Sequence, residues 1–393
     1  MSRYYSYINS AGEIVNQYNG QEPFAAFIKK YFSSHEKFGS NDRKQVSHLC
    51  YCYFRLGRAL PEKSIEEKML IGLFLCSSQH HEILEQLRPA WNEKIHLTLE
   101  EKCSILNVQY SMLNLFPFTE ELSGGIEEEQ FILSHLHQPD LFIRLRPGHE
   151  MSVKEKLQKD GIVFNQVSDT CLALPNSTDV DKIIELNKEA VIQDYSSQRT
   201  AELLFNLKSK IANLKFKVWD CCAASGGKSI MLYDLYANIE LTVSDLRDSI
   251  LNNLKRRFSQ AGIKRYESFV KDLTAAHSPF STHHSRFDLI ICDAPCSGSG
   301  TWGRTPEQLL YFEKSKIDYY ASIQKKIVSN VYTHLKAGGY LLYITCSVFK
   351  KENEDVVNYM RQNLKLELIQ GKLLKGYHLN ADTMFAALLR KQL

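Results

Sequence analysis

The sequence lacks the features that mark membrane, secreted and disulfide-stabilised proteins. No apolar run approaches the ~18 residues of a membrane-spanning helix, and the first residues show no signal-peptide core. Ten cysteines in 393 residues are too sparse for a disulfide scaffold, and none stands in a CxxC pair or a cysteine–histidine ladder of zinc spacing. We therefore expect a cytoplasmic protein with no metal site.

An excess of charge of one sign is also missing. The net charge is +3 and the isoelectric point is near 8.2, which permits a nucleic-acid partner without requiring one. The hydrophobic share of 44% and the charged share of 24% are typical of a globular protein. The length allows two or three domains, and nothing requires more than a monomer.

The spacing of apolar residues changes twice along the chain and predicts three domains. Residues 1–137 have helical spacing, residues 138–195 predict short strands around a helix, and residues 196–393 alternate strands and helices. The fold class expected is α/β: a Rossmann-like domain preceded by an all-α domain and a small α/β linking domain. Its sheet is expected to be parallel, with a closing hairpin, and one long helix is predicted near residues 306–335.

Two cysteines stand apart from the others. Cys296 and Cys346 each come just past a hydrophobic run that predicts a strand, and Asp293 ends the run before Cys296. Groups just past the carboxyl ends of strands line the ligand crevice of an open α/β sheet, which indicates covalent chemistry. Seven other cysteines lie among apolar residues and are predicted to be core: Cys50, Cys52, Cys76, Cys103, Cys171, Cys221 and Cys292.

Two glycine clusters resemble phosphate-binding motifs without matching them. Residues 220–229 follow the first strand of the α/β domain and end in Gly-Lys-Ser, but Cys222 stands where a P-loop needs glycine. Residues 298–303 read Gly-Ser-Gly-Thr-Trp-Gly, yet they follow a late strand and no acidic strand end lies ~20 residues on. A nucleotide triphosphate or a dinucleotide is therefore not expected.

Two acidic strand ends favour a different ligand. Asp245 ends the second strand, where a carboxylate accepts ribose hydroxyls, and Asp272 ends the third, within reach of an adenine amino group. Either residue alone could cap a helix. After a glycine turn, the pair indicates S-adenosylmethionine.

Several motifs together resemble the Sun/Nop family of RNA cytosine-5 methyltransferases over about residues 190–393. They are Ile192–Gln198, Ala223–Lys228, Asp293–Ser297, and Tyr343–Ser347 with Glu352-Asn-Glu354 after it. The helical N-terminus and the linking domain are similar to the bacterial subgroup that acts on small-subunit (16S-type) ribosomal RNA and carries a NusB-like RNA-binding domain.

The resemblance implies roles for named residues. Cys346 is the nucleophile that adds to cytosine C6, and Cys296 assists product release. Asp293 lies at cytosine N3, and Lys228 favours the thiolate. The methyl-donor contacts implied are Cys222, Ala223, Ala224, Ser225, Gly226, Gly227, Lys228, Asp245, Asp272 and Asp293.

The chain also departs from the family pattern. Proline usually stands at Ser225 and threonine often at Ser229, which leaves the stability of the turn open. A catalytically inactive RNA-binding scaffold and a methyltransferase of transfer RNA are the alternatives. Amino-methyltransferases have Asn/Asp-Pro-Pro-Tyr/Phe where this chain has Asp-Ala-Pro-Cys.

Overall fold

The computed structural model describes residues 3–109, 113–207, 216–236, 238–275 and 286–393. The chain forms two compact units. The helical unit comprises Met1–Glu120, Glu127–Gln138 and Thr301–Glu313, and the sheet unit comprises Glu121–Ile126, Pro139–Gly300 and Lys314–Leu393. The three domain ranges expected from the sequence stay predictions.

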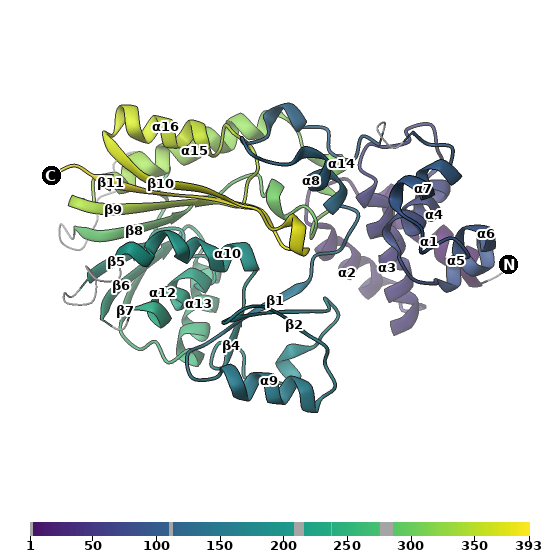
Figure 1. The fold of residues 1–393 in the computed structure, drawn as a ribbon, viewed down its shortest axis with the longest axis horizontal. Coiled ribbons are helices and arrows are strands. Elements are labelled where there is room, and N and C mark those ends of the chain that lie inside the picture. Colours follow the sequence, from purple (N-terminus) through teal and green to yellow (C-terminus); the bar gives the residue numbers. More distant parts are fainter. Residues whose placement is uncertain (1–2, 110–112, 208–215, 237, 276–285) are drawn as a thin grey trace. The chain divides into compact units, whose positions relative to one another are not determined.

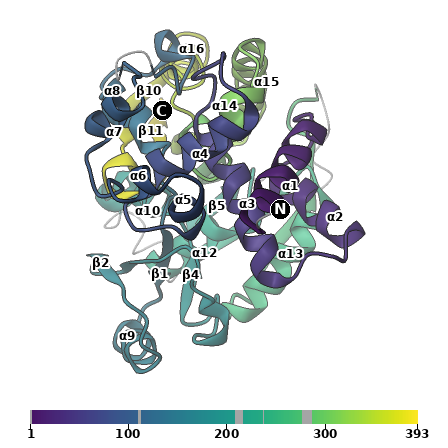
Figure 2. The same cartoon turned by 90° about the vertical axis from the view of Figure 1, so that its right-hand side faces the viewer.

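The helical unit confirms the helical spacing of the N-terminal residues (Figure 2). Two of its helices begin with capping boxes, in which Ser64 pairs with Glu67 and Thr98 pairs with Glu101. Its helices are α1 (Arg3–Gln17), α2 (Phe24–Ser34), α3 (Ser40–Arg55), α4 (Ile65–Cys76), α5 (Glu82–Leu87), α6 (Pro89–Asn92), α7 (Leu99–Ile105), α8 (Glu128–Ser134) and α14 (Gln308–Tyr311).

The segment Thr301–Glu313 comes from late in the sequence but belongs to the helical unit. Trp302 is fully buried, with its ring centroid 5.5 Å from that of Phe116. The Glu307 carboxylate accepts a hydrogen bond from the Phe24 backbone N–H at 3.2 Å. Because these groups are buried, the segment forms part of the core of the helical unit.

The sheet unit is built on a seven-stranded sheet of order β10-β11-β9-β8-β5-β6-β7 (Figure 1). The five strands from β9 to β7 are parallel, and β10 and β11 form the antiparallel hairpin predicted at the C-terminus. The fold class expected from the sequence is confirmed. The strands are β5 (Phe216–Asp220), β6 (Ile239–Asp245), β7 (Tyr266–Val270), β8 (Phe287–Asp293), β9 (Leu335–Thr345), β10 (Leu366–Leu374) and β11 (Met384–Lys391).

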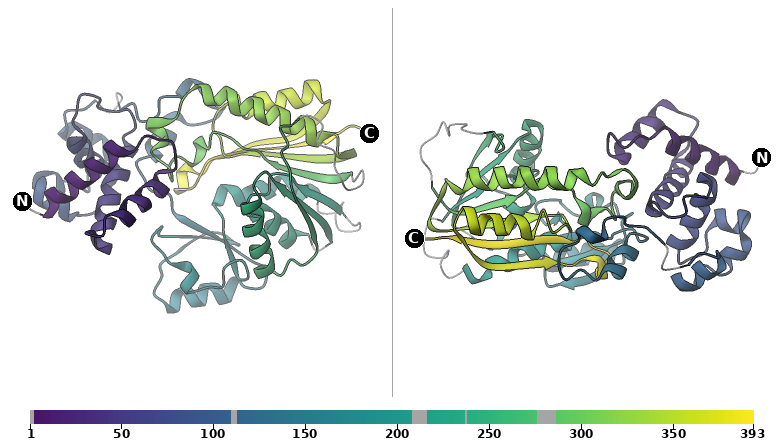
Figure 3. Two further views of the ribbon diagram at one scale, coloured as in Figure 1. Left: turned by 180° about the vertical axis from the view of Figure 1, so that it is seen from behind. Right: turned by 90° about the horizontal axis from the view of Figure 1, so that it is seen from above.

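Helices cover both faces of this sheet (Figure 3). One face packs against α12 (Gly227–Leu235) and α13 (Asp248–Gln260), and the other against α15 (Ser315–Tyr332) and α16 (Glu354–Asn363). Alternate residues of the buried strands contribute to the two hydrophobic cores, one on each face of the sheet, because successive side chains of a strand point to opposite faces. The core on the α15 and α16 side contains two cysteines, Cys221 and Cys292.

The long helix predicted near residues 306–335 is present as α15, but it begins later than predicted and a separate short helix, α14, precedes it. Phe312 has an extended backbone with φ −70° and ψ 135°, which ends α14, and α15 begins at Ser315. Each of the two helices buries apolar residues in a different unit. Apolar residues at helical spacing therefore continue from α14 into α15, and this spacing does not reveal the break between them. Strand β9 also starts five residues earlier than predicted, at Leu335 rather than Tyr340.

A small four-stranded antiparallel sheet precedes the large one in the sheet unit. Its order is β2-β3-β1-β4, with strands β1 (Leu141–Leu145), β2 (Asn165–Ser168), β3 (Cys171–Leu174) and β4 (Ala190–Ile192), and with helix α9 (Glu150–Lys159). Arg144 and Arg146 each form a buried ion pair of 2.7 Å with Asp234 of α12. These pairs join the small sheet to the large one.

Two further expectations concern burial. Of the seven cysteines predicted to be core, six are buried, and Cys76 is only half-buried. Every helix in the described part of the chain is too short or too polar to cross a membrane.

Candidate active site

The two cysteines singled out in the sequence meet in space. Cys296 and Cys346 follow the neighbouring parallel strands β8 and β9, and their Sγ atoms are 3.2 Å apart. The Ala294 backbone N–H donates to the carbonyl of Ile344 at 2.9 Å, which fixes the two strand ends side by side. Both thiols are half-buried. Two residues 50 positions apart thus form one sulfur pair at the carboxyl edge of the sheet.

The thiol of Cys296 is stabilised in its protonated form. A hydrogen bond with Cys346 and burial together raise the pKa of Cys296 well above its ordinary value. The two sulfur atoms share one hydrogen bond, which contributes to this stabilisation of the Cys296 thiol.

A buried glutamate, Glu352, accepts hydrogen bonds from the residues that follow both cysteines. The Glu352 carboxylate accepts hydrogen bonds from the Ser297 backbone N–H at 2.9 Å and from the Ser347 hydroxyl at 2.7 Å. A third comes from the Gln324 side-chain amide at 2.9 Å. Ser297 follows Cys296 and Ser347 follows Cys346, so one carboxylate holds the residue after each cysteine. The motif Glu352-Asn-Glu354 is visible in the sequence, but no sequence pattern predicts that Glu352 binds the residues after both cysteines.

The second glycine cluster serves close packing between loops. A Cβ atom at Gly300 would clash with the carbonyl oxygen of Thr383. The Gly300 N–H donates to the Cys346 carbonyl, and its own carbonyl accepts from the Thr383 N–H, each at 2.9 Å. Only glycine allows this approach, which locks the loop after Cys296 against the end of β9.

An ion pair lies beside the cysteines. Lys228 Nζ is 2.6 Å from Asp293 Oδ2. Burial disfavours the charge of Lys228, but attraction to Asp293 outweighs it and raises the pKa of Lys228, with a smaller contribution from Cys346. A permanent positive charge therefore lies within electrostatic range of the Cys346 sulfur.

The first glycine cluster forms a tight turn that continues into α12. Gly226 has φ +83°, a left-handed conformation that glycine adopts without strain. The Ala224 N–H donates to Asp245 Oδ2 at 3.0 Å. Arg257 donates to the Ser225 hydroxyl at 2.6 Å and to its carbonyl at 2.9 Å. These bonds hold the turn at the position where serine replaces the usual proline.

A buried carboxyl lies beneath this turn. Asp220 ends β5, and its Oδ2 accepts a hydrogen bond of 2.6 Å from the Ser229 hydroxyl. Burial raises the pKa of Asp220 to about 7. Serine at position 229 thus supplies the same kind of hydroxyl as threonine would. The sequence contained both residues, but nothing in it indicated that they pair.

The two acidic strand ends differ in their surroundings. Asp245 is buried, and its orientation is set by the N–H groups of Ala224 and Arg247. Asp272 is exposed and accepts two hydrogen bonds from Thr274, which lower its pKa. Carboxylate oxygens can accept more than one hydrogen bond, so both can still bind ligand hydroxyl or amino groups. The residues present therefore fit a nucleoside ligand such as S-adenosylmethionine.

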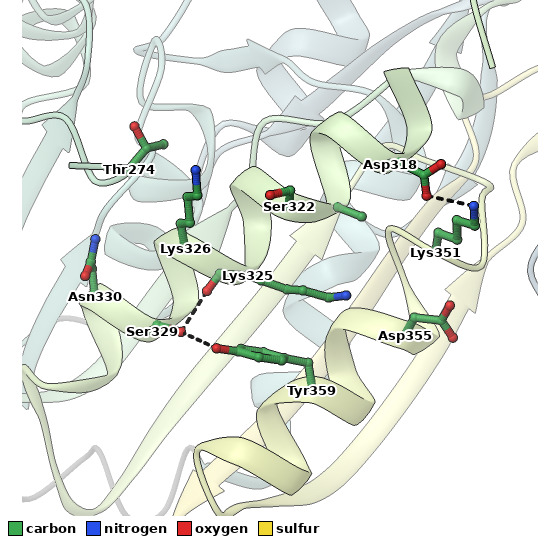
Figure 4. A pocket seen from close by; sticks show the side chains of 11 residues that line it. Thr274, Asp318, Ser322, Lys325, Lys326, Ser329, Asn330, Lys351, Asp355 and Tyr359 are labelled. Atoms are coloured by element: carbon green, nitrogen blue, oxygen red, sulfur yellow. Dashed lines mark hydrogen bonds and ion pairs between the residues drawn. The ribbon is translucent and has the colours of Figure 1, made fainter. Parts of the chain in front are cut away.

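A separate groove lies between α15 and α16 (Figure 4). It has a volume of about 760 Å³, and Lys325, Lys351 and Tyr359 are among its lining residues. Lys351 forms an ion pair with Asp318 at 2.7 Å. None of the site residues predicted from the sequence lines this groove.

Part of the chain is similar to a family of known methyltransferases. Residues 211–389 match the family described as 16S rRNA methyltransferase RsmB/F. These residues belong to the RsmB/F family. A curated relative, ribosomal RNA small subunit methyltransferase B of Shewanella oneidensis, is 31% identical over 193 residues, which are 49% of this chain and 43% of that protein. The chain thus spans about half the length of the RsmB/F relatives that it matches.

Solved structures support the fold of this chain. The crystal structure of PH0851 covers 100% of both chains with a TM-score of 0.71 and 19% identity. NSun6 from Pyrococcus horikoshii, solved with SFG, an analogue of S-adenosylmethionine, has a TM-score of 0.58 and 14% identity. That match covers 70% of this chain and 97% of NSun6.

Proposed function

We propose that this protein transfers a methyl group from S-adenosylmethionine to C5 of a cytosine in RNA, with small-subunit ribosomal RNA as the substrate. The observation that carries the proposal is the pair of thiols 3.2 Å apart beside the Lys228–Asp293 ion pair. The family match and the name of the relative from Shewanella oneidensis support ribosomal RNA as the substrate.

Cys346 is the proposed nucleophile. Cytosine C5 is poorly nucleophilic until a thiolate adds at C6, which makes C5 an enamine-like carbon; this is covalent catalysis. Only the ionised sulfur attacks, and the charge of Lys228 lies within electrostatic range of Cys346. Cys296 holds its own proton, which supports the assignment of Cys346 rather than Cys296 as the attacking group.

Asp293 and Cys296 are proposed to handle the proton movements. Asp293 shares or donates a proton at cytosine N3, and the positive charge of Lys228 beside it offsets the negative charge that develops on the ring when the carbon–sulfur bond forms. After methylation a water molecule accepts the C5 proton, the electron pair of the C5–H bond re-forms the C5–C6 double bond, and the bond between Cys346 and C6 breaks to release the thiolate. Cys296 lies beside that bond and assists this elimination.

The donor site is proposed on the turn Cys222–Lys228 together with Asp245, Asp272 and Asp293. S-adenosylmethionine supplies an electrophilic methyl group when it is bound. The residues of the chain orient it: backbone groups of the turn approach it closely, Asp245 accepts the ribose hydroxyls, and Asp272 meets the adenine amino group.

RNA selection is proposed to lie with the helical unit and the small sheet, mainly through loop shape and phosphate contacts. The target base must be unpaired or flipped so that the two thiols reach its ring. A location in the cytoplasm fits this substrate.

Trapping the covalent intermediate tests the proposal. Cys296→Ala protein is incubated with S-adenosylmethionine and unmodified small-subunit ribosomal RNA, and a protein–RNA adduct is sought on a denaturing gel. We expect a shifted band that disappears in the Cys296→Ala/Cys346→Ala double variant. No adduct, while the wild type methylates the same RNA, would overturn the mechanism. No methylation by the wild type would favour an RNA-binding scaffold or another RNA substrate.

A further inference from the structure

Three thiols converge at the base of the donor turn. Cys221 and Cys222 follow β5, and Cys292 lies in β8, the neighbouring parallel strand. Their Sγ atoms all lie within 4.8 Å of one another, and Cys221 Sγ is 4.0 Å from Cys222 Sγ. Cys221 and Cys292 are buried as predicted, but no sequence pattern indicates that they meet, because about 70 residues separate them.

The backbone fixes this convergence. The Cys221 N–H donates to the Ile291 carbonyl at 2.9 Å, which sets Cys221 beside Cys292. Both thiols lie in the core on the α15 and α16 side, and Cys222 packs against the same core while staying half-buried. The three side chains therefore converge, and Cys222 is the least buried of the three residues.

The spacing suits a thiolate-bound metal ion. Zinc–sulfur bonds are about 2.3 Å long, which places sulfurs about 3.8 Å apart around a tetrahedral ion and about 4.0 Å apart around a trigonal one. The Cys221–Cys222 distance already equals the trigonal value, and the widest separation needs to close by less than about 1 Å. Rotation about the half-buried side chain of Cys222 supplies such a movement.

We propose that Cys221, Cys222 and Cys292 bind a soft divalent metal ion of the zinc class. Each thiol releases its proton to solvent and forms one sulfur–metal bond, so three protons are lost per ion bound. Three sulfur donors select zinc or cadmium over magnesium and calcium. A fourth coordination position stays open on the Cys222 side.

This site adjoins the donor turn, because Cys222 is also the first residue of that turn. Metal binding therefore anchors the turn to β8. The metal site itself does not depend on methyl transfer, since the ligands are defined by the sulfur positions alone.

Cadmium titration of the full chain tests the proposal. The background is the Cys296→Ser/Cys346→Ser variant, because that sulfur pair would compete for the ion. We expect one cadmium ion per chain, a sulfur-to-cadmium charge-transfer absorption band, and release of about three protons in weak buffer. No donor and no RNA are present, so the result does not depend on whether the proposed function is right.

Two further substitutions in this background locate the ion. Cys222→Ser is expected to weaken cadmium binding by more than the roughly 10- to 100-fold that loss of an outer-shell partner costs. Cys52→Ser is the matched control, because Cys52 is also buried and has a second donor nearby, His48 Nε2 at 3.7 Å. It should leave binding unchanged. Circular dichroism verifies folding, and Cys222→Ala replaces Cys222→Ser if the latter unfolds.

Three results would overturn the proposal. They are no charge-transfer band in the folded background protein, equal cadmium binding after removal of the Cys222 thiol, and loss of binding in Cys52→Ser. The last two would show that cadmium binds elsewhere in the chain.

Discussion

Replacing Glu352 by glutamine should lower the rate of methyl transfer by more than the loss of unfolding free energy would explain, because Glu352 positions the two thiols. The carboxylate is fully buried and accepts three hydrogen bonds, two of them from residues adjacent to the cysteines. Glutamine keeps one oxygen for the Ser297 N–H and the Gln324 amide, and only the bond with Ser347 must reverse direction. Hydrogen bonds to charged groups contribute about 1.5–3 kcal/mol, so partial retention predicts a loss of about 1–2 kcal/mol in unfolding free energy.

The effect on catalysis should be larger. A displacement of about 1 Å between reacting groups costs about 100-fold in rate, and Glu352 holds the residue that follows each cysteine. We expect kcat to fall between about 10- and 100-fold, with donor affinity unchanged because the side chains and backbone groups that Glu352 binds, in Ser297, Gln324 and Ser347, lie outside the glycine turn. Single-turnover methylation, donor binding by calorimetry and urea unfolding measure the three quantities.

The same substitution two residues further on serves as the control. Glu354 accepts from the Ser123 hydroxyl and the Gly124 N–H, not from the cysteine loops. Glu354→Gln should therefore leave kcat within about threefold of the wild type, a change of less than 1 kcal/mol in activation free energy. A Glu352→Gln enzyme with normal kcat, or one that loses donor affinity equally, would refute the positioning role.

Three other variants probe separate parts of the site. Asp220→Asn should reduce the pH dependence of the unfolding free energy. Because the pKa of Asp220 is raised to about 7 in the folded protein, its protonated carboxyl favours the folded state at low pH. That contribution, up to about 4 kcal/mol, is lost as the pH rises from about 4 to 7. Urea unfolding at several pH values measures this slope. Gly300→Ala should abolish methylation and lower the unfolding temperature because of its backbone clash, whereas Gly371→Ala, with open space around it, should do neither. Arg257→Ala frees Ser225 and should weaken donor binding about 10-fold, equivalent to about 1.4 kcal/mol, with kcat at saturating donor unchanged; an unaltered dissociation constant would contradict this.

Local features of the fold were predictable from the sequence. Strand β6 has the predicted bounds Ile239–Asp245, because a short apolar run between turn residues defines a buried strand. Cys296, Cys346, Lys228 and Asp293 were chosen as strand-end or turn residues, and parallel strands bring such residues to one edge of the sheet.

Contacts over long sequence separations were not predictable. Glu352 stands 55 residues from Ser297, and no periodic pattern links a glutamate after one strand to a backbone N–H after another. Arg257 compensates for Ser225 from a helix 32 residues away. The break between α14 and α15 was not predictable, because helices buried in two different units still place apolar residues at an unbroken helical spacing.

The inclusion of Thr301–Glu313 in the helical unit has a consequence for synthesis on the ribosome. The N-terminal helices emerge first, but their core lacks Trp302 and Glu307 until residue 313 has left the tunnel, about 175 residues after Gln138. At translation rates of roughly 5–20 residues per second, that delay is about 9–35 s. During this interval the apolar surface that packs against Trp302 stays uncovered, so the unit whose synthesis begins first must wait for a segment from late in the chain before its core is complete.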